Sequence, residues 1–272
     1  MGKRSHFAGI PRMPALFGQQ AGPRQLPDRP GLWPSSAGRL TNTWVVAESE
    51  PEKLAALLPE GFELAAPYLV AEAISLEGLP WLAGRGYEML MLSIPVIYRG
   101  KEQYKGRLEI VTWEDCPDAI ISGRDELGWN KVYADRMGRR VSEDGKTVFY
   151  SASWGGRTFF EMRVDHDNRT PHFKDWREGP LMHYRVLPRT GRWGELEVEQ
   201  VTGAGFGGGM PAPRSYESGT GNFCFHRSSF QQLPTHCHVV NKLAEISVKR
   251  VIDAGSIHLE GWSDLSDMRV IG

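Results

Sequence analysis

Residues 120–135 of this 272-residue chain read IISGRDELGWNKVYAD. The stretch sets Lys131 among apolar neighbours, with Trp129 shortly before it and Val132 directly after it. A lysine in such surroundings is either a surface side chain that reaches solvent or one whose ammonium is held where it is poorly hydrated. In the second case the amine can attack a carbonyl carbon. The resulting Schiff base is an electron sink for making or breaking an adjacent carbon–carbon bond.

The same window carries a family resemblance. A Gly-Arg-acid sequence (residues 123–125), a glycine (Gly128), an aromatic residue and then a lysine resemble the signature of the acetoacetate decarboxylase superfamily. The resemblance implies that Lys131 is the Schiff-base lysine. In acetoacetate decarboxylase a second lysine follows directly and helps to activate the first, whereas this chain has Val132. Lys131 therefore lacks that sequence-adjacent cation.

Composition narrows the class of ligand. The formal net charge is −1 and the pI is about 6.7, so no long-range attraction for nucleic acid or an anionic membrane is expected. No apolar run approaches the length of a membrane span, and the N-terminus lacks the apolar core of a signal peptide. Three cysteines are a sparse and odd set, which argues against a disulfide framework and favours a reducing, cytoplasmic location.

The chain divides into an arm and one domain. Residues 1–38 are rich in proline and glycine, which predicts an extended N-terminal arm, and residues 39–272 are expected to form a single domain. The arm is more apolar than a free linker, so we expect it to pack over the domain or over a neighbouring subunit. The family resemblance also implies a homo-oligomer. The apolar residues of the arm are Phe7, Ile10, Met13, Leu16, Phe17, Leu32 and Trp33.

The domain is predicted to be rich in β-strands. Strand-like patterns cover residues 41–47, 68–75, 87–98, 148–154, 181–188, 195–201 and 244–248, and a short helix is expected over 50–58. Short strands separated by glycine and proline turns favour an antiparallel fold, closed or sandwiched. The resemblance implies a β-rich α+β domain with an antiparallel, β-barrel-like core and short peripheral helices.

Two acidic residues on these strands are candidate catalytic residues. Glu72 lies among apolar residues, and Glu88 follows Tyr87 at the head of a long apolar stretch. Ion pairing or simple exposure explains such acids as well as a site role does. In the superfamily, acids on these two strands line the active site, which makes Glu88, Glu72 and the neighbouring Tyr87 candidates. The spacing from Glu88 to the following Ile-Pro-Val is one residue longer than the family pattern.

Two arginines and one tryptophan are candidates for substrate binding. Arg124 has the planar fork that binds a carboxylate, although pairing with Asp125 to brace the turn explains it equally well. Arg39 stands where the superfamily keeps an arginine. Trp129, next to the lysine, is expected to line an apolar pocket, and core packing is the alternative.

Two further motifs predict less. Residues 203–208 match the dinucleotide-binding glycine pattern after a strand, but proline follows where the phosphate-binding helix should begin, so no such cofactor is expected. His236, Cys237 and His238 would place two imidazoles on one face of a strand. Because no zinc-type spacing accompanies them, no metal site is predicted there.

The sequence thus favours a Schiff-base lyase that acts through Lys131 on a keto acid or a related carbonyl compound. Because Val132 supplies no cation next to Lys131, burial is the remaining means of activating the lysine. Decarboxylase and aldolase-dehydratase chemistry therefore both stay open. The alternative is a non-covalent cyclase or a binder of an apolar metabolite on the same scaffold, with Lys131 as a hydrogen-bond donor.

Overall fold

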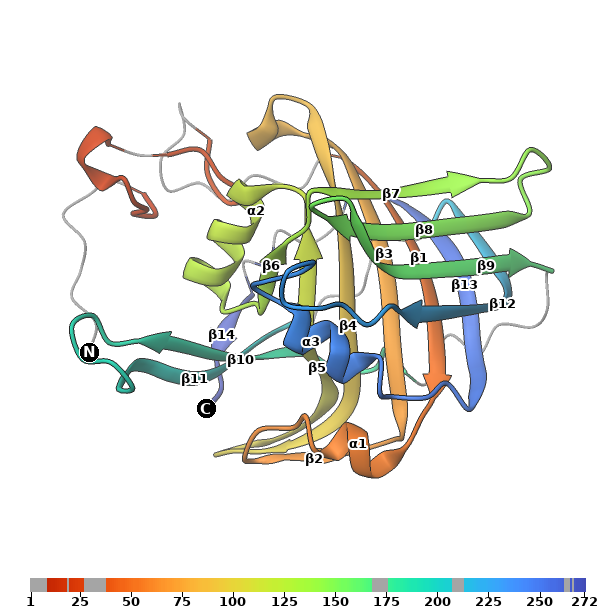
Figure 1. Ribbon diagram of the computed structural model, residues 1–272. Coiled ribbons are helices and arrows are strands. Elements are labelled where there is room, and N and C mark those ends of the chain that lie inside the picture. The colour runs from red at the N-terminus through yellow and green to blue at the C-terminus, as the bar shows by residue number, and fades with distance from the viewer. Residues whose placement is uncertain are drawn as a thin grey trace.

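The computed structural model describes residues 9–18, 20–26, 38–167, 176–206, 213–261, 265 and 267–272. Within these residues fourteen strands form one sheet (Figure 1). The strands are β1 (Arg39–Glu48), β2 (Phe62–Leu64), β3 (Tyr68–Leu79), β4 (Arg85–Arg99), β5 (Gln103–Glu114), β6 (Lys131–Tyr133), β7 (Arg136–Val141), β8 (Thr147–Trp154), β9 (Arg157–His166), β10 (Leu181–Pro188), β11 (Leu196–Ala204), β12 (Ser215–Phe225), β13 (Arg250–Glu260) and β14 (Arg269–Val270).

The helices of the described residues are short and lie at the periphery, as the sequence predicted. They are α1 (Pro51–Ala55), α2 (Pro117–Ser122) and α3 (Cys237–Leu243), the 3-10 turns η1 (Ala15–Phe17) and η2 (Pro80–Leu82), and the π-helical turn η3 (Gly123–Leu127). None of them is long and apolar enough to cross a membrane.

The sheet curls but does not close into a barrel, which corrects the barrel-like core expected from the sequence. The strand order is β14-β11-β10-β5-β4-β3-β1-β13-β12-β9-β8-β7, with β2 on β4 and β6 on β5. Strand β6 leads towards β7, but it is three residues long and, within the described residues, pairs with β5. In Figure 1 β7, β8, β9 and β12 run across β3 and β4, while β10 and β11 project to one side.

Strand β5 lies between β4 and β10 in the sheet and also pairs with β6. It pairs antiparallel with β4, and its two halves pair in parallel with different strands. Residues 107–109 lie beside β10, and residues 112–114 lie beside β6. A register shift between Leu92 and Ser93 of β4 accompanies this change of partner. Because β6 begins at Lys131, this branch point positions the lysine.

The two faces of the sheet bury different side chains. Along β4, Leu90 and Leu92 belong to the main core, whereas Met89 and Met91 pack with Trp129 in a second cluster. This alternation is the period of a β-strand. We call the face that carries the main core the inner face and the opposite one the outer face. Trp113 and Phe160 lie on the inner face, and Trp44 with Trp176 forms a third cluster on the outer face.

Near the C-terminus the strand prediction is wrong in two places. Residues 236–238, expected on a strand, begin helix α3, and residues 244–248, also expected as a strand, follow its end. Val240 and Leu243 of α3 are buried together with Leu233, which is the three-to-four residue spacing of a helix. The helix expected over 50–58 shortens to α1.

The arm is held to the domain by charge. Arg12 and Arg24 both pair with Glu126 of η3, each through its Nε at 2.8 Å and through a second nitrogen. Both guanidinium groups are buried. Three apolar residues of the arm are not packed against the described part of the domain: Met13, Leu16 and Phe17 are 81%, 93% and 86% exposed. Phe7, Leu32 and Trp33 lie outside the described residues.

Candidate active site around Lys131

The residues before Lys131 form a helical segment where the sequence predicted a turn. Pro117 in the first turn of α2 fits a helix start, and the helix continues into η3. Gly128 ends it with φ of 87°, a left-handed conformation that favours glycine. The amides of Gly128 and Trp129 both donate to the Gly123 carbonyl, at 2.9 and 3.1 Å. The chain then turns directly into β6.

Lys131 is buried beneath this segment on the outer face. Its side chain is 8% exposed, and its Nζ lies 2.8 Å from Glu114 Oε1. Nζ also donates to the Ala119 carbonyl at 3.2 Å and sits 5.1 Å from the Trp129 ring centroid. Gly123 provides the space, because a Cβ on it would lie 2.5 Å from Lys131 Cε. The amine is therefore enclosed by one acid, one carbonyl and apolar walls.

Glu114 is the carboxylate that the structure brings to the lysine. It is fully buried, and burial raises its pKa although the nearby Lys131 charge opposes this rise. In the part of the chain described, Lys131 is its ion-pair partner and it accepts no well-oriented hydrogen bond. Burial and the Glu114 charge also raise the pKa of Tyr87. A raised pKa makes a carboxylate a better proton acceptor, which suits it to proton transfer.

A buried polar network supports the entry into β6. Glu109 accepts hydrogen bonds from the Asn130 amide at 3.1 Å, from Asn130 Nδ2 at 3.0 Å and from Thr112 Oγ1 at 2.9 Å. His183 Nδ1 lies 3.1 Å from the same carboxylate, and the His183 ring stacks on Trp129 with centroids 4.5 Å apart. Burial lowers the pKa of His183. The network fixes Asn130 and the ring of Trp129 at the entry into β6.

The structure places Glu88 on the other face of the sheet from Lys131. Val132 packs against the main core, so Lys131 points to the outer face, whereas Glu88 shares the inner face with Leu90. The Glu88 carboxylate accepts a hydrogen bond from Ser75 at 2.7 Å, and its charge acts on the buried Tyr150. Burial raises the pKa of Glu88. The sequence prediction that Glu88 serves Lys131 is therefore not matched by their placement.

The alternation of side chains along β4 explains this placement. The outer-face position next to Tyr87 is Met89. The cross-strand partner of Met89 is Glu114 on β5. The carboxylate beside the lysine thus comes from the neighbouring strand. Sequence reasoning missed Glu114, although an acid in the apolar run before Asp115 resembled the signal that selected Glu72.

Glu72 lies on the outer face but at a different place. Its carboxylate is 2% exposed and pairs with Arg107 and, at 2.8 Å, with Arg177. Asn42 Nδ2 donates to it at 2.8 Å. Burial would raise the pKa of Glu72, but the two arginines outweigh burial and lower it. These contacts give Glu72 the features of a permanently charged structural anchor.

The candidate arginines are engaged elsewhere. Arg124 donates to the main-chain oxygen of Lys131 at 3.0 Å, so it braces the lysine backbone. Arg39 is 68% exposed and pairs with Glu77 at 2.9 Å, at the start of β1. Trp129, by contrast, lies beside the lysine amine, with Lys131 Nζ 5.1 Å from its ring centroid. Tyr87 packs against the same outer-face cluster and contacts Trp81 edge to face.

Comparisons with known proteins agree with this architecture. The family described as Acetoacetate decarboxylase (ADC) matches residues 13–208. A comparison with curated proteins finds no match. Among solved structures, acetoacetate decarboxylase from Legionella pneumophila is 19% identical, with a TM-score of 0.61 and coverage of 91% of this chain and 93% of that one.

Two further solved structures share the fold. The enduracididine biosynthesis enzyme MppR, complexed with pyruvate, is 15% identical with a TM-score of 0.64, covering 88% of this chain and 91% of that one. An acetoacetate decarboxylase-like enzyme from Sphingomonas wittichii RW1 is 16% identical with a TM-score of 0.60, covering 85% and 93%. At these identities the likeness establishes the fold.

Proposed function

We propose, on the premise that this chain belongs to the acetoacetate decarboxylase (ADC) family, that it is a lyase-type enzyme that forms a Schiff base through Lys131. The substrate class is a keto acid or a related carbonyl compound, and the reaction is of the decarboxylase or aldolase-dehydratase type. The observation that carries the proposal is the buried pair of Lys131 Nζ and Glu114 Oε1, 2.8 Å apart.

The pair offers a route to a neutral amine without a neighbouring cation. Transfer of one proton from the ammonium to Glu114 leaves an uncharged amine beside an uncharged acid. A low-dielectric site disfavours separated charges, and burial raises the pKa of the accepting carboxyl. Glu114 thereby compensates for the valine that stands where acetoacetate decarboxylase has its second lysine.

The neutral amine then attacks the substrate carbonyl carbon. Loss of water, with one proton taken up from solvent, gives a protonated imine that accepts the electron pair released when the adjacent carbon–carbon bond breaks. Glu114 returns its proton to the resulting enamine carbon, and water hydrolyses the imine to free the amine. In the decarboxylation branch the departing fragment is carbon dioxide. In the aldol branch no carbon–carbon bond breaks first: the protonated imine loses a proton from the adjacent carbon to water, and the resulting enamine carbon attacks a second carbonyl carbon.

The walls of the site support a carbonyl substrate with apolar surroundings. Met89 and Met91 lie on the outer face beside Glu114 and Thr112 of β5, and Thr112 is the register partner of Lys131. Trp129 closes the side next to the amine. Thioether and aromatic side chains exclude water and adapt to an apolar fragment.

The non-covalent alternative also has an observation in its favour. The Lys131 ammonium already has two oxygen partners, the Glu114 carboxylate and the Ala119 carbonyl. A lysine held in this way can serve as a fixed hydrogen-bond donor to a bound carbonyl oxygen. This reading describes a cyclase or a binder, and it forms no covalent bond to the substrate.

Reductive trapping separates the two functions. The full chain is incubated with pyruvate or acetoacetate and borohydride, and the intact mass is measured. We expect a single covalent adduct, located at Lys131 by peptide mapping and lost in Lys131→Ala. As the matched control, Lys105→Ala removes an exposed lysine on β5 and should retain the adduct. A protein left unmodified by a panel of keto acids, or an adduct that survives in Lys131→Ala, would overturn the Schiff-base mechanism.

A further inference from the structure

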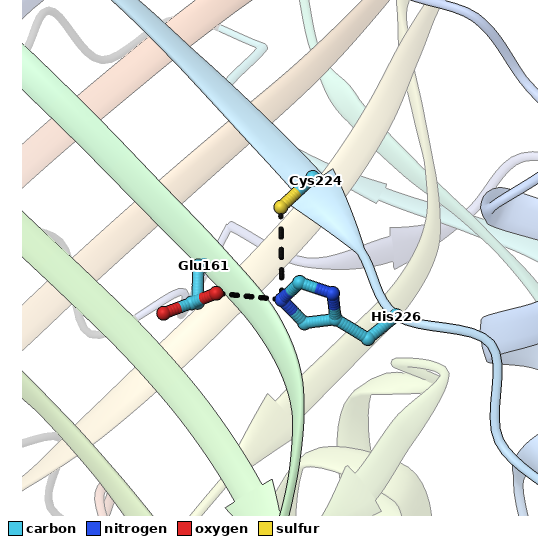
Figure 2. Close-up of side chains that lie close together, drawn as sticks. All are labelled: Glu161, Cys224 and His226. Carbon is cyan, nitrogen blue, oxygen red and sulfur yellow. Dashed lines mark hydrogen bonds and ion pairs between the residues drawn. The ribbon is translucent and has the colours of Figure 1, made fainter.

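A second group of reactive side chains lies on the outer face of the sheet, on strands other than those that hold Lys131. Glu161 of β9 and Cys224 of β12 are directly opposed in the antiparallel register. His226 follows two residues after Cys224, just beyond the end of β12, so both side chains emerge on the same face. Figure 2 shows the three side chains converging.

The converging atoms are three different metal donors. His226 Nε2 lies 2.6 Å from Glu161 Oε2 and 3.7 Å from Cys224 Sγ. One thiol sulfur, one imidazole nitrogen and one carboxylate oxygen lie within 4.8 Å of one another. The neighbouring Phe223 and Phe225 point into the core, so Cys224, which stands between them on β12, points to the opposite face.

We propose that Glu161, Cys224 and His226 bind one zinc ion. A tetrahedral zinc with sulfur at about 2.3 Å and nitrogen at about 2.0 Å places those two ligands about 3.5 Å apart. The separation of Cys224 Sγ from His226 Nε2 already matches this value. A nitrogen and an oxygen on the same ion are about 3.4 Å apart, so the Glu161 carboxylate must move outward. That side chain is 59% exposed and has room to do so.

The donor set selects the class of metal. A thiolate with an imidazole favours zinc and similar transition metals over magnesium or calcium, which prefer oxygen ligands. Binding releases the Cys224 thiol proton to solvent as the zinc–sulfur bond forms, with no change in oxidation state. Three protein ligands leave the fourth tetrahedral position for a water molecule. The ion would tie β9 to β12 across the ladder.

The sequence pointed to a different cluster. It drew attention to His236, Cys237 and His238, which the fold places at the start of α3. In the cluster proposed here, Glu161 is separated along the chain from Cys224 by 63 positions and from His226 by 65 positions. Strand pairing alone brings them together. The flagged motif therefore provides a matched control with the same residue types.

The test is a zinc titration of the metal-stripped full chain against a chromophoric chelator, alongside a Co²⁺ titration read by absorption. We expect one equivalent of zinc and, with Co²⁺, a thiolate-to-metal charge-transfer band. His226→Gln and Cys224→Ser should each weaken zinc binding by at least about 100-fold, and Glu161→Gln by about 10-fold, in the range that altered zinc shells show. Cys224→Ser should also abolish the charge-transfer band.

The control variant Cys237→Ser with His238→Gln should bind as the wild type does. No zinc bound by the wild type, wild-type affinity in His226→Gln and Cys224→Ser, or loss of binding in the control variant would each overturn the proposal. Far-ultraviolet circular dichroism establishes that each variant is folded. The site is independent of the lysine chemistry, so borohydride trapping at Lys131 is expected to be the same with and without zinc.

Discussion

Two buried glutamates on the outer face, Glu72 and Glu114, have pKa values that are shifted in opposite directions. Both carboxylates are almost completely shielded from solvent, and both face basic side chains. Glu72 has two arginines and an asparagine, and its pKa is lowered against the effect of burial. Glu114 has one lysine, and burial keeps its pKa raised. The number of donors around a buried carboxylate, and not its burial, decides whether its pKa is lowered or raised.

This difference separates a structural role from a chemical one. A carboxylate fixed by two guanidinium groups stays ionised and cannot exchange a proton at neutral pH. A carboxylate with a single amine partner can form the uncharged pair with it. Sequence reasoning selected Glu72 as a catalytic residue, and the contacts of the two acids support Glu114 in that role. Substitutions at and around the two acids test this contrast, beginning with the largest effect.

Glu72→Gln should have the largest effect on stability. It removes the buried carboxylate that Arg107 and Arg177 share, and breaking a buried pair in this way costs about 3–5 kcal/mol. The free energy of unfolding from urea titration measures the loss. Glu77→Gln, which breaks the exposed pair with Arg39, is the control and should cost less than about 1 kcal/mol. Equal losses in the two variants would contradict the anchoring role of Glu72.

Glu114→Gln should instead act on the chemistry. The amide cannot take the proton of Lys131, so imine formation should slow by about 100-fold or more, the usual contribution of a general base. The rate of borohydride-trapped adduct formation with pyruvate gives the measurement. Glu88→Gln is the matched control, since its side chain lies on the inner face. If Glu88→Gln slowed trapping as much as Glu114→Gln, the assignment of the base would fail.

Gly123→Ala tests the space around the amine. The new Cβ would lie 2.5–2.7 Å from the end of the Lys131 side chain, so the lysine must shift. A displacement of about 1 Å costs a reacting group about 100-fold in rate. We expect trapping to fall accordingly while the protein stays folded, as judged by circular dichroism. Gly138→Ala, at a glycine with open space around it, should trap at the wild-type rate.

The pH dependence of stability should differ in sign between the two acids. The folded pKa of Glu72 lies below its ordinary 4.5, so its contribution to stability is present above that pH and is lost as the pH falls. The folded pKa of Glu114 lies above 4.5, so its unfavourable contribution is absent below that pH and grows as the pH rises.

Urea titrations between about pH 3 and pH 7 test both signs. We expect the deficit of Glu72→Gln relative to the wild type to shrink towards the acidic end of this range. Relative to the wild type, Glu114→Gln should be more favourable at the neutral end than at the acidic end. The slopes are the smallest effect, at most about 1.4 kcal/mol per pH unit for one group. Equal pH dependence of stability in the two variants would contradict the opposite pKa shifts of the two acids.

Most of the strands and the lysine were predictable from sequence, because both depend on local patterns. Alternating apolar runs located β1, β3, β4, β8 and β10, and the Gly-Arg-acid window located Lys131. The family signature spans residues that adjoin in the chain. Its helical continuation through η3 was missed, since two glycines and an arginine–acid pair are also typical of a turn.

The partner of the lysine was not predictable, because it depends on strand register. A shift of one residue turns every side chain of a strand to the opposite face. Glu88 and Met89 lie on opposite faces of β4, and the cross-strand position of Glu114 follows from pairing between β4 and β5. The opposition of Glu161 and Cys224 is likewise a product of pairing. Neither pairing can be read from a single sequence.

The attachment of the arm has a practical consequence for how the protein is handled. Arg12 and Arg24 hold Glu126, and Glu126 belongs to η3, the segment that covers Lys131. A chain shortened to begin at β1 would keep every strand of the sheet. It would also leave an acid without its two cations in the segment above the amine. An inactive short form would therefore say nothing about the function of the intact protein.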